Sequence, residues 1–228
     1  IAAEKAGIIK EGARAVLAGQ QPDAAAVLLE RCAAVGAPAL REGVDFGLLE
    51  RQLAVGGQVI RIQTADGPLG DLHLPLFGEH MARNAAQAVA AVETFLGGKA
   101  LAPELIQDAF DATEAPARLE TLRTAPTVLL DTCHNPHGAR ATVDAIKEAF
   151  AFTPLVGLVA MVRDKDAEGV LRIFEEVMDE IVCTQMSTTT RGLSAEQLAD
   201  IARDVFGANR VHAVARMDDA IEQAIARA

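Results

Sequence analysis

Three polar clusters in the second half of the chain could bind or transform a ligand, because each one closely follows a short apolar run. They are residues 131–137 (DTCHNPH), 163–166 (RDKD) and 184–191 (TQMSTTTR). In an open parallel sheet, ligands bind beyond the carboxyl ends of the strands, where loops and helix N-termini converge. If the three apolar runs are parallel strands, the ionisable side chains of this half gather at one edge of the sheet.

Each cluster also has a purely structural interpretation. Asp131 could cap a helix, Asn135-Pro136 could begin one, and residues 164–166 could form a solvated turn. For any one cluster considered alone, the structural interpretation is favoured.

A metal site is a further interpretation of Cys133, His134 and His137. A structural zinc site normally needs four ligands, and the sequence has no second ligand pair at zinc spacing, so zinc is not supported. The three cysteines are far apart and form no Cys-x-x-Cys, which argues against a disulfide framework. That usage is typical of a reducing compartment, and a cytoplasmic location is expected.

The elements that must position these clusters follow from the alternation of apolar runs and amphipathic stretches. Strands are expected at 127–130, 155–160, 180–184 and 211–214, and helices at 136–150, 166–178, 194–206 and 218–226. Short apolar strands separated by helices bury both of their faces in a parallel sheet with crossover helices. The predicted fold class of this half is Rossmann-like α/β with a parallel sheet.

The first half is predicted to be the end of a larger mixed domain. Helices are expected at 22–35, 79–96 and 103–113, around a hairpin whose strands 59–62 and 69–74 bracket Asp66-Gly67. An Asp-Gly pair tolerates the positive φ of a tight turn. Pro116 biases Ala115 away from helix, so domains are expected at 1–115 and 124–228 with a linker at 116–123.

Charge and hydropathy exclude two classes of partner. The formal net charge is −11, divided as −5 up to Arg123 and −6 after it. Neither half carries the clustered Lys and Arg that displace counterions from a nucleic acid, so no nucleic-acid partner is expected. No apolar run approaches the ~20 residues of a membrane helix, and no membrane role is expected.

Five segments occur in the order and approximate spacing of a known family. They are residues 1–10 (IAAEKAGIIK), 78–85 (GEHMARNA), 116–120 (PARLE), 131–136 (DTCHNP) and 164–166 (DKD). On these segments the sequence resembles the folylpolyglutamate synthases and dihydrofolate synthases of the FolC type, within the Mur ligase superfamily. The resemblance implies the tail of a Mur-ligase-like central ATPase domain followed by a Rossmann-like glutamate-ligase domain.

The family implies an ATP-dependent ligase of folate metabolism. Such a ligase couples the carboxylate of a folate or of dihydropteroate to the amine of L-glutamate through an acyl phosphate. Carboxylate and amine do not condense spontaneously in water, so the acid must be phosphorylated, and Mg²⁺ and positive groups stabilise that transfer. ATP and Mg²⁺ are the implied cofactors, and a monomer is expected.

The resemblance also implies roles for single residues. Lys5 matches the EKAGI lysine, which CO₂ carbamylates into an anionic ligand near the metals. Asn84 matches the asparagine that contacts adenine, and Arg118 the linker arginine that reaches the phosphates. Asp131 matches the aspartate that contacts the nucleotide, and His134 a histidine at the γ-phosphate and the incoming glutamate.

Two further cations are expected to serve the glutamate. A bound glutamate needs a cation for each carboxylate, and Lys165 and Arg191 could supply them beside His134. The alternatives stay open: Lys5 as a solvated helix lysine, His134 as a cap of the helix at Pro136, and Arg191 as part of a mobile loop.

The sequence departs from the family in three respects. Ala117 stands where the family usually has Gly, which could adopt a positive φ that Ala resists. The family's Asp-Gly-Ala-His-Asn-Pro is Asp-Thr-Cys-His-Asn-Pro here. No Gly-x-x-x-x-Gly-Lys-Ser/Thr phosphate loop occurs, so the sequence is expected to be a downstream part of a ligase and inactive by itself.

Two other functions remain as alternatives. A peptidoglycan Mur ligase shares the Asn, Arg and Asp positions, but the EKAGI segment and the lack of a Mur-type Asp-Asn-Pro-Arg motif favour the folate branch. A non-catalytic nucleotide- or amino-acid-binding module, or a degraded paralogue, is the alternative from a different class.

Overall fold

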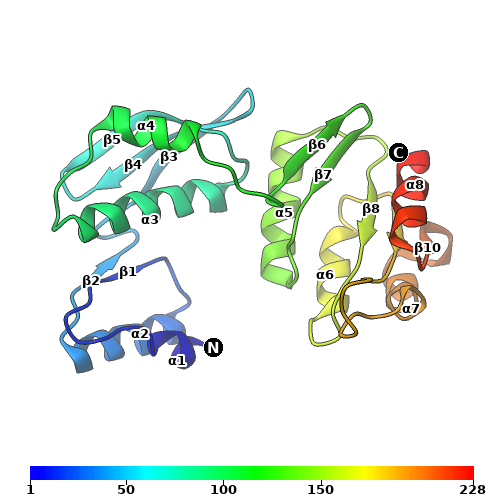
Figure 1. The fold of residues 1–228 in the computed structure, drawn as a ribbon, viewed down its shortest axis with the longest axis horizontal. Coiled ribbons are helices and arrows are strands. Elements are labelled where there is room, and N and C mark those ends of the chain that lie inside the picture. The colour runs from blue at the N-terminus through cyan, green and yellow to red at the C-terminus, as the bar shows by residue number, and fades with distance from the viewer. The chain divides into compact units, whose positions relative to one another are not determined.

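The computed structural model describes residues 1–228, and the chain divides into two compact units, Ile1–Glu114 and Ala115–Ala228 (Figure 1). The boundary falls at the segment where Pro116 interrupts the periodic sequence. Each unit has its own buried core.

The first unit contains four helices and five strands. In chain order they are α1 (Ala2–Ala6), β1 (Ala15–Leu17), α2 (Pro22–Val35), β2 (Ala39–Arg41), β3 (Gly47–Ala54), β4 (Gly57–Thr64), β5 (Gly67–Leu74), α3 (Glu79–Phe95) and α4 (Pro103–Asp111). Strands β3, β4 and β5 form an antiparallel sheet, and β1 and β2 form a separate parallel pair. The predicted hairpin is confirmed, since Thr64 pairs with Gly67 at the end of β4 and β5.

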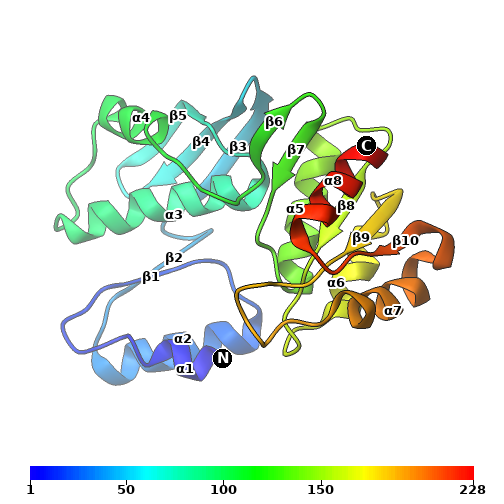
Figure 2. The ribbon, with the colours of Figure 1, turned by 45° about the vertical axis from the view of Figure 1, so that its right-hand side comes forward.

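The long helix α3 lies between these two sheets, as both ribbon views show (Figures 1 and 2). Its small residues Ala82 and Ala86 are almost fully buried beside Ile60, Ile62 and Leu74 of the antiparallel sheet. Alanine has no bulky side chain, so the helix backbone approaches the sheet closely. The packing fixes the helix that carries Asn84.

The second unit contains five strands, four α-helices and a short 3₁₀ turn. In chain order they are β6 (Glu120–Thr124), β7 (Thr127–Leu130), α5 (Pro136–Ala149), β8 (Val156–Val159), α6 (Ala167–Phe174), β9 (Glu180–Cys183), α7 (Ala195–Phe206), the 3₁₀ turn Ala208–Arg210, β10 (Val211–Ala213) and α8 (Met217–Arg227). Strands β8, β9 and β10 are parallel, in the order β10-β9-β8. The α/β class predicted for this half is confirmed.

One of the predicted strands pairs differently from the prediction. The run 127–130 was expected to join the parallel sheet, but β7 pairs antiparallel with β6 in a separate two-stranded sheet. The physical reason lies in β6, whose polar sequence ETLRT gives no apolar signal and falls largely in the segment 116–123 that we predicted as a linker. Strand β7 is also only partly buried, which an apolar run does not reveal.

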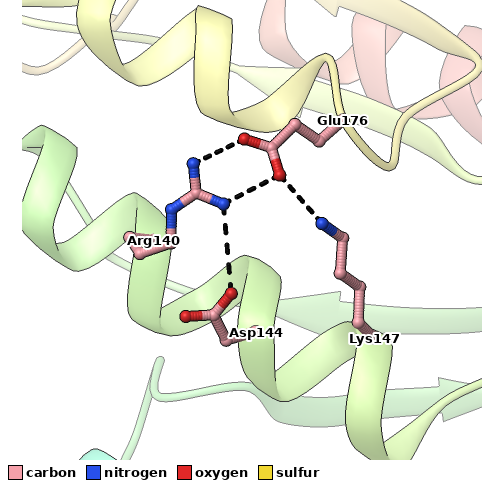
Figure 3. A network of polar contacts seen from close by, with 4 residues as sticks. All are labelled: Arg140, Asp144, Lys147 and Glu176. Carbon is pink, nitrogen blue, oxygen red and sulfur yellow. Dashed lines mark hydrogen bonds and ion pairs between the residues drawn. The ribbon is translucent and has the colours of Figure 1, made fainter.

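A network of charged side chains joins α5 to the turn after α6 (Figure 3). The Glu176 carboxylate accepts hydrogen bonds from Arg140 and from Lys147, with Nη1–Oε2 and Nζ–Oε2 distances of 2.8 Å. Asp144 adds an ion pair to Arg140 at 3.9 Å. The hydrogen bonds from Arg140 and Lys147 lower the pKa of Glu176 to about 2.

No helix of the chain has the length and apolar character needed to cross a membrane.

Candidate functional site

Asp131 binds three groups from separate segments of the second unit. Its Oδ2 accepts a hydrogen bond from the Leu119 N–H at 3.0 Å. Its Oδ1 accepts from the Cys133 N–H at 2.7 Å and from Thr142 Oγ1 at 3.1 Å. Asp131 therefore does not cap a helix, contrary to its structural interpretation. It fixes the segment before β6 to the loop after β7.

The segment before β6 holds Arg118 against the same loop. The Thr132 N–H donates to the Ala117 carbonyl at 3.1 Å, and Arg118 Nη1 donates to Thr132 Oγ1 at 2.8 Å. Ala117 and Leu119, on either side of Arg118, have φ values of +56° and +48°. Few residues other than Gly adopt this region, so Arg118 is presented by a strained turn.

His134 is exposed at the end of this loop. Its Nδ1 lies 3.1 Å from the Thr132 carbonyl oxygen, which can only accept. This bond requires the proton on Nδ1 and leaves Nε2 free to accept or, when protonated, to donate. Asn135 caps α5, because its Oδ1 accepts from the Gly138 N–H at 2.8 Å. The structure therefore places the cap on the neighbouring residue rather than on His134.

The loops that follow β8 and β9 pair with each other. The Arg163 N–H donates to the Arg191 carbonyl at 3.0 Å, and Arg191 Nη2 donates to Asp164 Oδ1 at 2.9 Å. Lys165 Nζ lies 3.9 Å from Asp164 Oδ2. The hydrogen bond from Arg191 lowers the pKa of Asp164 below its ordinary range. Asp164, Lys165 and Arg191 thus form one cluster, in which Arg191 already has a carboxylate partner.

The starts of α5 and α6 lie in direct contact. A side chain built on Gly169 would meet Pro136 Cγ at 2.9 Å, so the first turns of the two helices touch. Asp166 caps α6 by accepting from the Gly169 N–H at 2.8 Å. The loop of His134 and the loop of Lys165 consequently lie at the same edge of this unit. That edge also holds two helix N-termini, which favour anions.

Cys133 does not provide reactive chemistry at this edge. Burial raises the pKa of its thiol to about 11, and the negative charge of Asp131 contributes in the same direction. The thiolate, which is the nucleophile and metal ligand, is therefore scarce at neutral pH. No group of three or more His, Cys, Asp or Glu side chains in the chain could hold a metal ion.

The other two predicted residues lie in the first unit. Lys5 is on the short helix α1, with a side chain 68% exposed and its Nζ 3.6 Å from Glu4. Asn84 is exposed on α3, and its Nδ2 lies 4.0 Å from Met81 Sδ. Lys5 pairs with Glu4 and Asn84 lies beside Met81. Arg118, Asp131 and His134, in contrast, share one cluster in the second unit.

Sequence reasoning missed an ion pair beside Asn84. Glu42 follows β2, and its carboxylate accepts from Arg83 Nε at 2.6 Å. The hydrophobic pattern does not indicate this ion pair, because β1 and β2 are three residues each and too short to show periodicity.

Known proteins are similar to this chain in sequence and in fold. The family model described as Mur ligase, glutamate ligase domain matches residues 117–228. A dihydrofolate synthase/folylpolyglutamate synthase of Mycobacterium tuberculosis is 41% identical over 98% of this chain and 48% of its own length. The chain belongs to the Mur ligase family, and it is similar to the folylpolyglutamate and dihydrofolate synthases of that family.

Solved structures of this Mur ligase group agree with the fold of the chain. Folylpolyglutamate synthase of M. tuberculosis, complexed with ADP and AMPPCP, matches with a TM-score of 0.94 and 40% identity over 99% of this chain and 52% of that one. E. coli FolC in complex with DHPP and ADP matches with a TM-score of 0.80 and 25% identity over 100% of this chain and 50% of that one. The chain spans about half the length of these relatives.

Proposed function

We propose that this chain belongs to an ATP-dependent ligase that joins L-glutamate to the carboxylate of a folate or of dihydropteroate. The observation that carries the proposal is the edge of the second unit, where exposed His134 and Lys165 lie beside two touching helix N-termini. Such an edge suits a small dicarboxylic amino acid, because each carboxylate finds a cation or helix amides. The similarity to folylpolyglutamate synthases supports glutamate as that amino acid.

Each residue then has a definite task. His134 and Lys165 bind the glutamate, and Nε2 of His134 is the atom available to take a proton from its amine. Arg191 binds the glutamate only if it gives up its hydrogen bond to Asp164. Arg118 supplies positive charge to the nucleotide phosphates, and Asp131 holds the turn that presents it.

ATP supplies the phosphoryl group that converts the substrate carboxylate into an acyl phosphate, and Mg²⁺ neutralises charge during that transfer. Asn84 is proposed to contact adenine. Lys5 is proposed to act as a carbamate ligand, but its surroundings provide only the carboxylate of Glu4. The chain by itself brings together no group of three or more His, Cys, Asp or Glu side chains that could hold the metal.

The cellular setting follows the same proposal. Three free cysteines, two of them buried, suit a reducing cytoplasm. A net charge of −11 without a basic patch supports a monomer that binds neither nucleic acid nor membrane.

The proposal is tested by a substrate panel on a full-length ligase that contains this chain. Purified protein receives ATP, Mg²⁺ and L-glutamate with dihydropteroate, tetrahydrofolate or a peptidoglycan precursor, and ADP release is measured with and without the glutamate. We expect glutamate-dependent release with a pteridine substrate only. Release with the peptidoglycan precursor alone would favour another Mur ligase, and binding without any release would favour a non-catalytic module.

A further inference from the structure

A nearly buried carboxylate joins the start of α3 to the ends of β1 and β2. Glu42 accepts hydrogen bonds from Arg83 Nε at 2.6 Å and from the Gly19 N–H, just after β1, at 2.7 Å. The Glu42 side chain is only 9% exposed, whereas that of Arg83 is 45% exposed. Three segments that are far apart in the sequence thus meet at one carboxylate.

The fit around this carboxylate is close. A side chain on Gly19 would lie 2.8 Å from Arg83 Nη2, so the guanidinium occupies the space that Gly19 leaves. One turn further along α3, Gln87 Nε2 donates to the Val16 carbonyl at 3.2 Å. The first turns of α3 are therefore held by Gln87 on β1 and by Arg83 on Glu42, which follows β2.

Each member of the ion pair favours the charged form of the other. The hydrogen bond from Arg83 lowers the pKa of Glu42, and the same bond raises the pKa of Arg83. A carboxylate this far out of water is costly unless it is paired and hydrogen-bonded. Both groups are therefore charged and bound to each other at neutral pH.

The residues just before α3 are also held in place. Gln58 is fully buried, and its Nε2 donates to the carbonyls of Leu76 at 2.8 Å and Gly78 at 3.0 Å. The N-cap Gly78 provides no side-chain cap of its own. Side chains of other elements, Gln58 and Glu42, thus set the position of the helix start.

We propose that Glu42 is a positioning residue for the nucleotide, acting through Arg83 on the adjacent Asn84. The inference rests on the proposed function, in which Asn84 contacts adenine. Gly19 and Glu42 mark the carboxyl ends of a parallel pair, which is the edge where ligands bind in such sheets. Loss of the ion pair releases the start of α3 and misplaces the Asn84 amide.

The test compares Glu42→Gln with Glu50→Gln in a full-length ligase that contains this chain. Glu50 is the matched control, because its ion pair with Arg61 at 3.5 Å is exposed and lies on β3 and β4. We expect Glu42→Gln to raise the KM for ATP about tenfold and to leave kcat within about twofold, since misplacement weakens binding before chemistry. Glu50→Gln should leave both unchanged.

A second measurement separates positioning from simple stability. Amide hydrogen exchange in the 228-residue chain should be faster at residues 79–84 in Glu42→Gln than in Glu50→Gln. Arg83→Lys, which keeps the charge but not the planar fork, replaces Glu42→Gln if that variant fails to fold, and should raise the KM for ATP by a smaller factor.

The outcomes distinguish this inference from the proposed function. An active Glu42→Gln ligase with the wild-type KM for ATP overturns the inference alone, even if residues 79–84 exchange faster. A wild-type ligase that shows no ATP-dependent activity contradicts the proposed function, and the nucleotide role of Glu42 with it. A raised KM for ATP without faster exchange at residues 79–84 also overturns the inference, because α3 would not have moved.

Discussion

At the residue scale, strain is concentrated around Arg118. Ala117 and Leu119 both adopt positive φ, and this conformation costs an ordinary residue roughly 1–2 kcal/mol. Strained backbone persists where surrounding contacts over-determine it. Here those contacts are the Asp131 bond to the Leu119 N–H and the Thr132 bonds to the Ala117 carbonyl.

Replacing Ala117 with Gly should therefore stabilise the chain by about 1 kcal/mol, because Gly adopts φ > 0 without steric cost. The free energy of unfolding from urea titration measures the effect. The control is Ala88→Gly on the exposed face of α3, which should destabilise by about 1 kcal/mol. Destabilisation by both variants would contradict the left-handed conformation of Ala117.

His134→Ala should lower turnover, and it should weaken the binding of glutamate far more than the binding of ATP. The reason is that His134 lies at the edge proposed for glutamate and offers Nε2 there. Steady-state kinetics of a full-length ligase, varying glutamate and ATP separately, measure the difference. His137→Ala is the control, since His137 is also exposed and lies three residues further on, in α5. Equal effects of the two variants would remove His134 from the site.

At the element scale, hydrophobic pattern predicted the elements that bury a continuous apolar face. Strands β8, β9 and β10, the hairpin of β4 and β5, and the helices α3 and α5 all lie where the pattern placed them. The pattern missed β1 and β2, which are too short, β3, whose side chains are mostly exposed or half-buried, and β6, which is polar. These strands form because they pair with a neighbouring strand rather than because they bury an apolar face. The local sequence does not identify that neighbour.

The same limit applies to the candidate site. The clusters at the edge of the second unit were predicted because each follows an apolar run, and the roles of Asp131 and His134 were implied by the family resemblance. The capping role of Asn135, the bonds of Asp131 and the pairing of Arg191 with Asp164 depend on tertiary geometry. Glu42 was missed for the same reason, because its partner Arg83 is 41 residues away along the chain.

The network at Glu176 predicts how acid affects the contact between α5 and the turn after α6. Its folded pKa of about 2 lies below the ordinary value of 4.5, so the carboxylate stabilises the fold fully above pH 4.5. That contribution is lost as the pH falls from 4.5 through about 2. The difference in Tm between wild type and Glu176→Gln should shrink over this window. Glu168→Gln, which breaks a pair within one helix, should show a smaller difference throughout.

At the scale of the whole molecule, the two units divide the proposed work. The first carries Lys5 and Asn84, and the second carries Arg118, Asp131, His134, Lys165 and Arg191. No phosphate loop of the Gly-x-x-x-x-Gly-Lys-Ser/Thr type occurs in these 228 residues. We therefore expect no glutamate-dependent ADP release from the 228-residue chain above a buffer control, whereas a full-length ligase should show it.

Lys5→Ala in a full-length ligase should lose most activity, because the carbamate would be the anionic ligand that the metal needs. Short carboxylates such as acetate should restore part of the rate by occupying the vacated place. ADP release with and without added acetate measures the rescue. Wild-type activity in Lys5→Ala would identify Lys5 as an ordinary exposed lysine, as its pairing with Glu4 alone would allow.

The acyl phosphate proposed for this ligase is tested by following an oxygen atom through the reaction. If the carboxylate of the folate or dihydropteroate is phosphorylated, one of its oxygens bridges to phosphorus, and attack by the glutamate amine expels that oxygen with the phosphate. A full-length ligase that contains this chain is given ATP, glutamate and substrate labelled with ¹⁸O in the carboxylate, and the inorganic phosphate is analysed by mass spectrometry. We predict ¹⁸O in the phosphate in proportion to the amide formed. Amide product with unlabelled phosphate would contradict an acyl phosphate, and with it the function proposed for this chain.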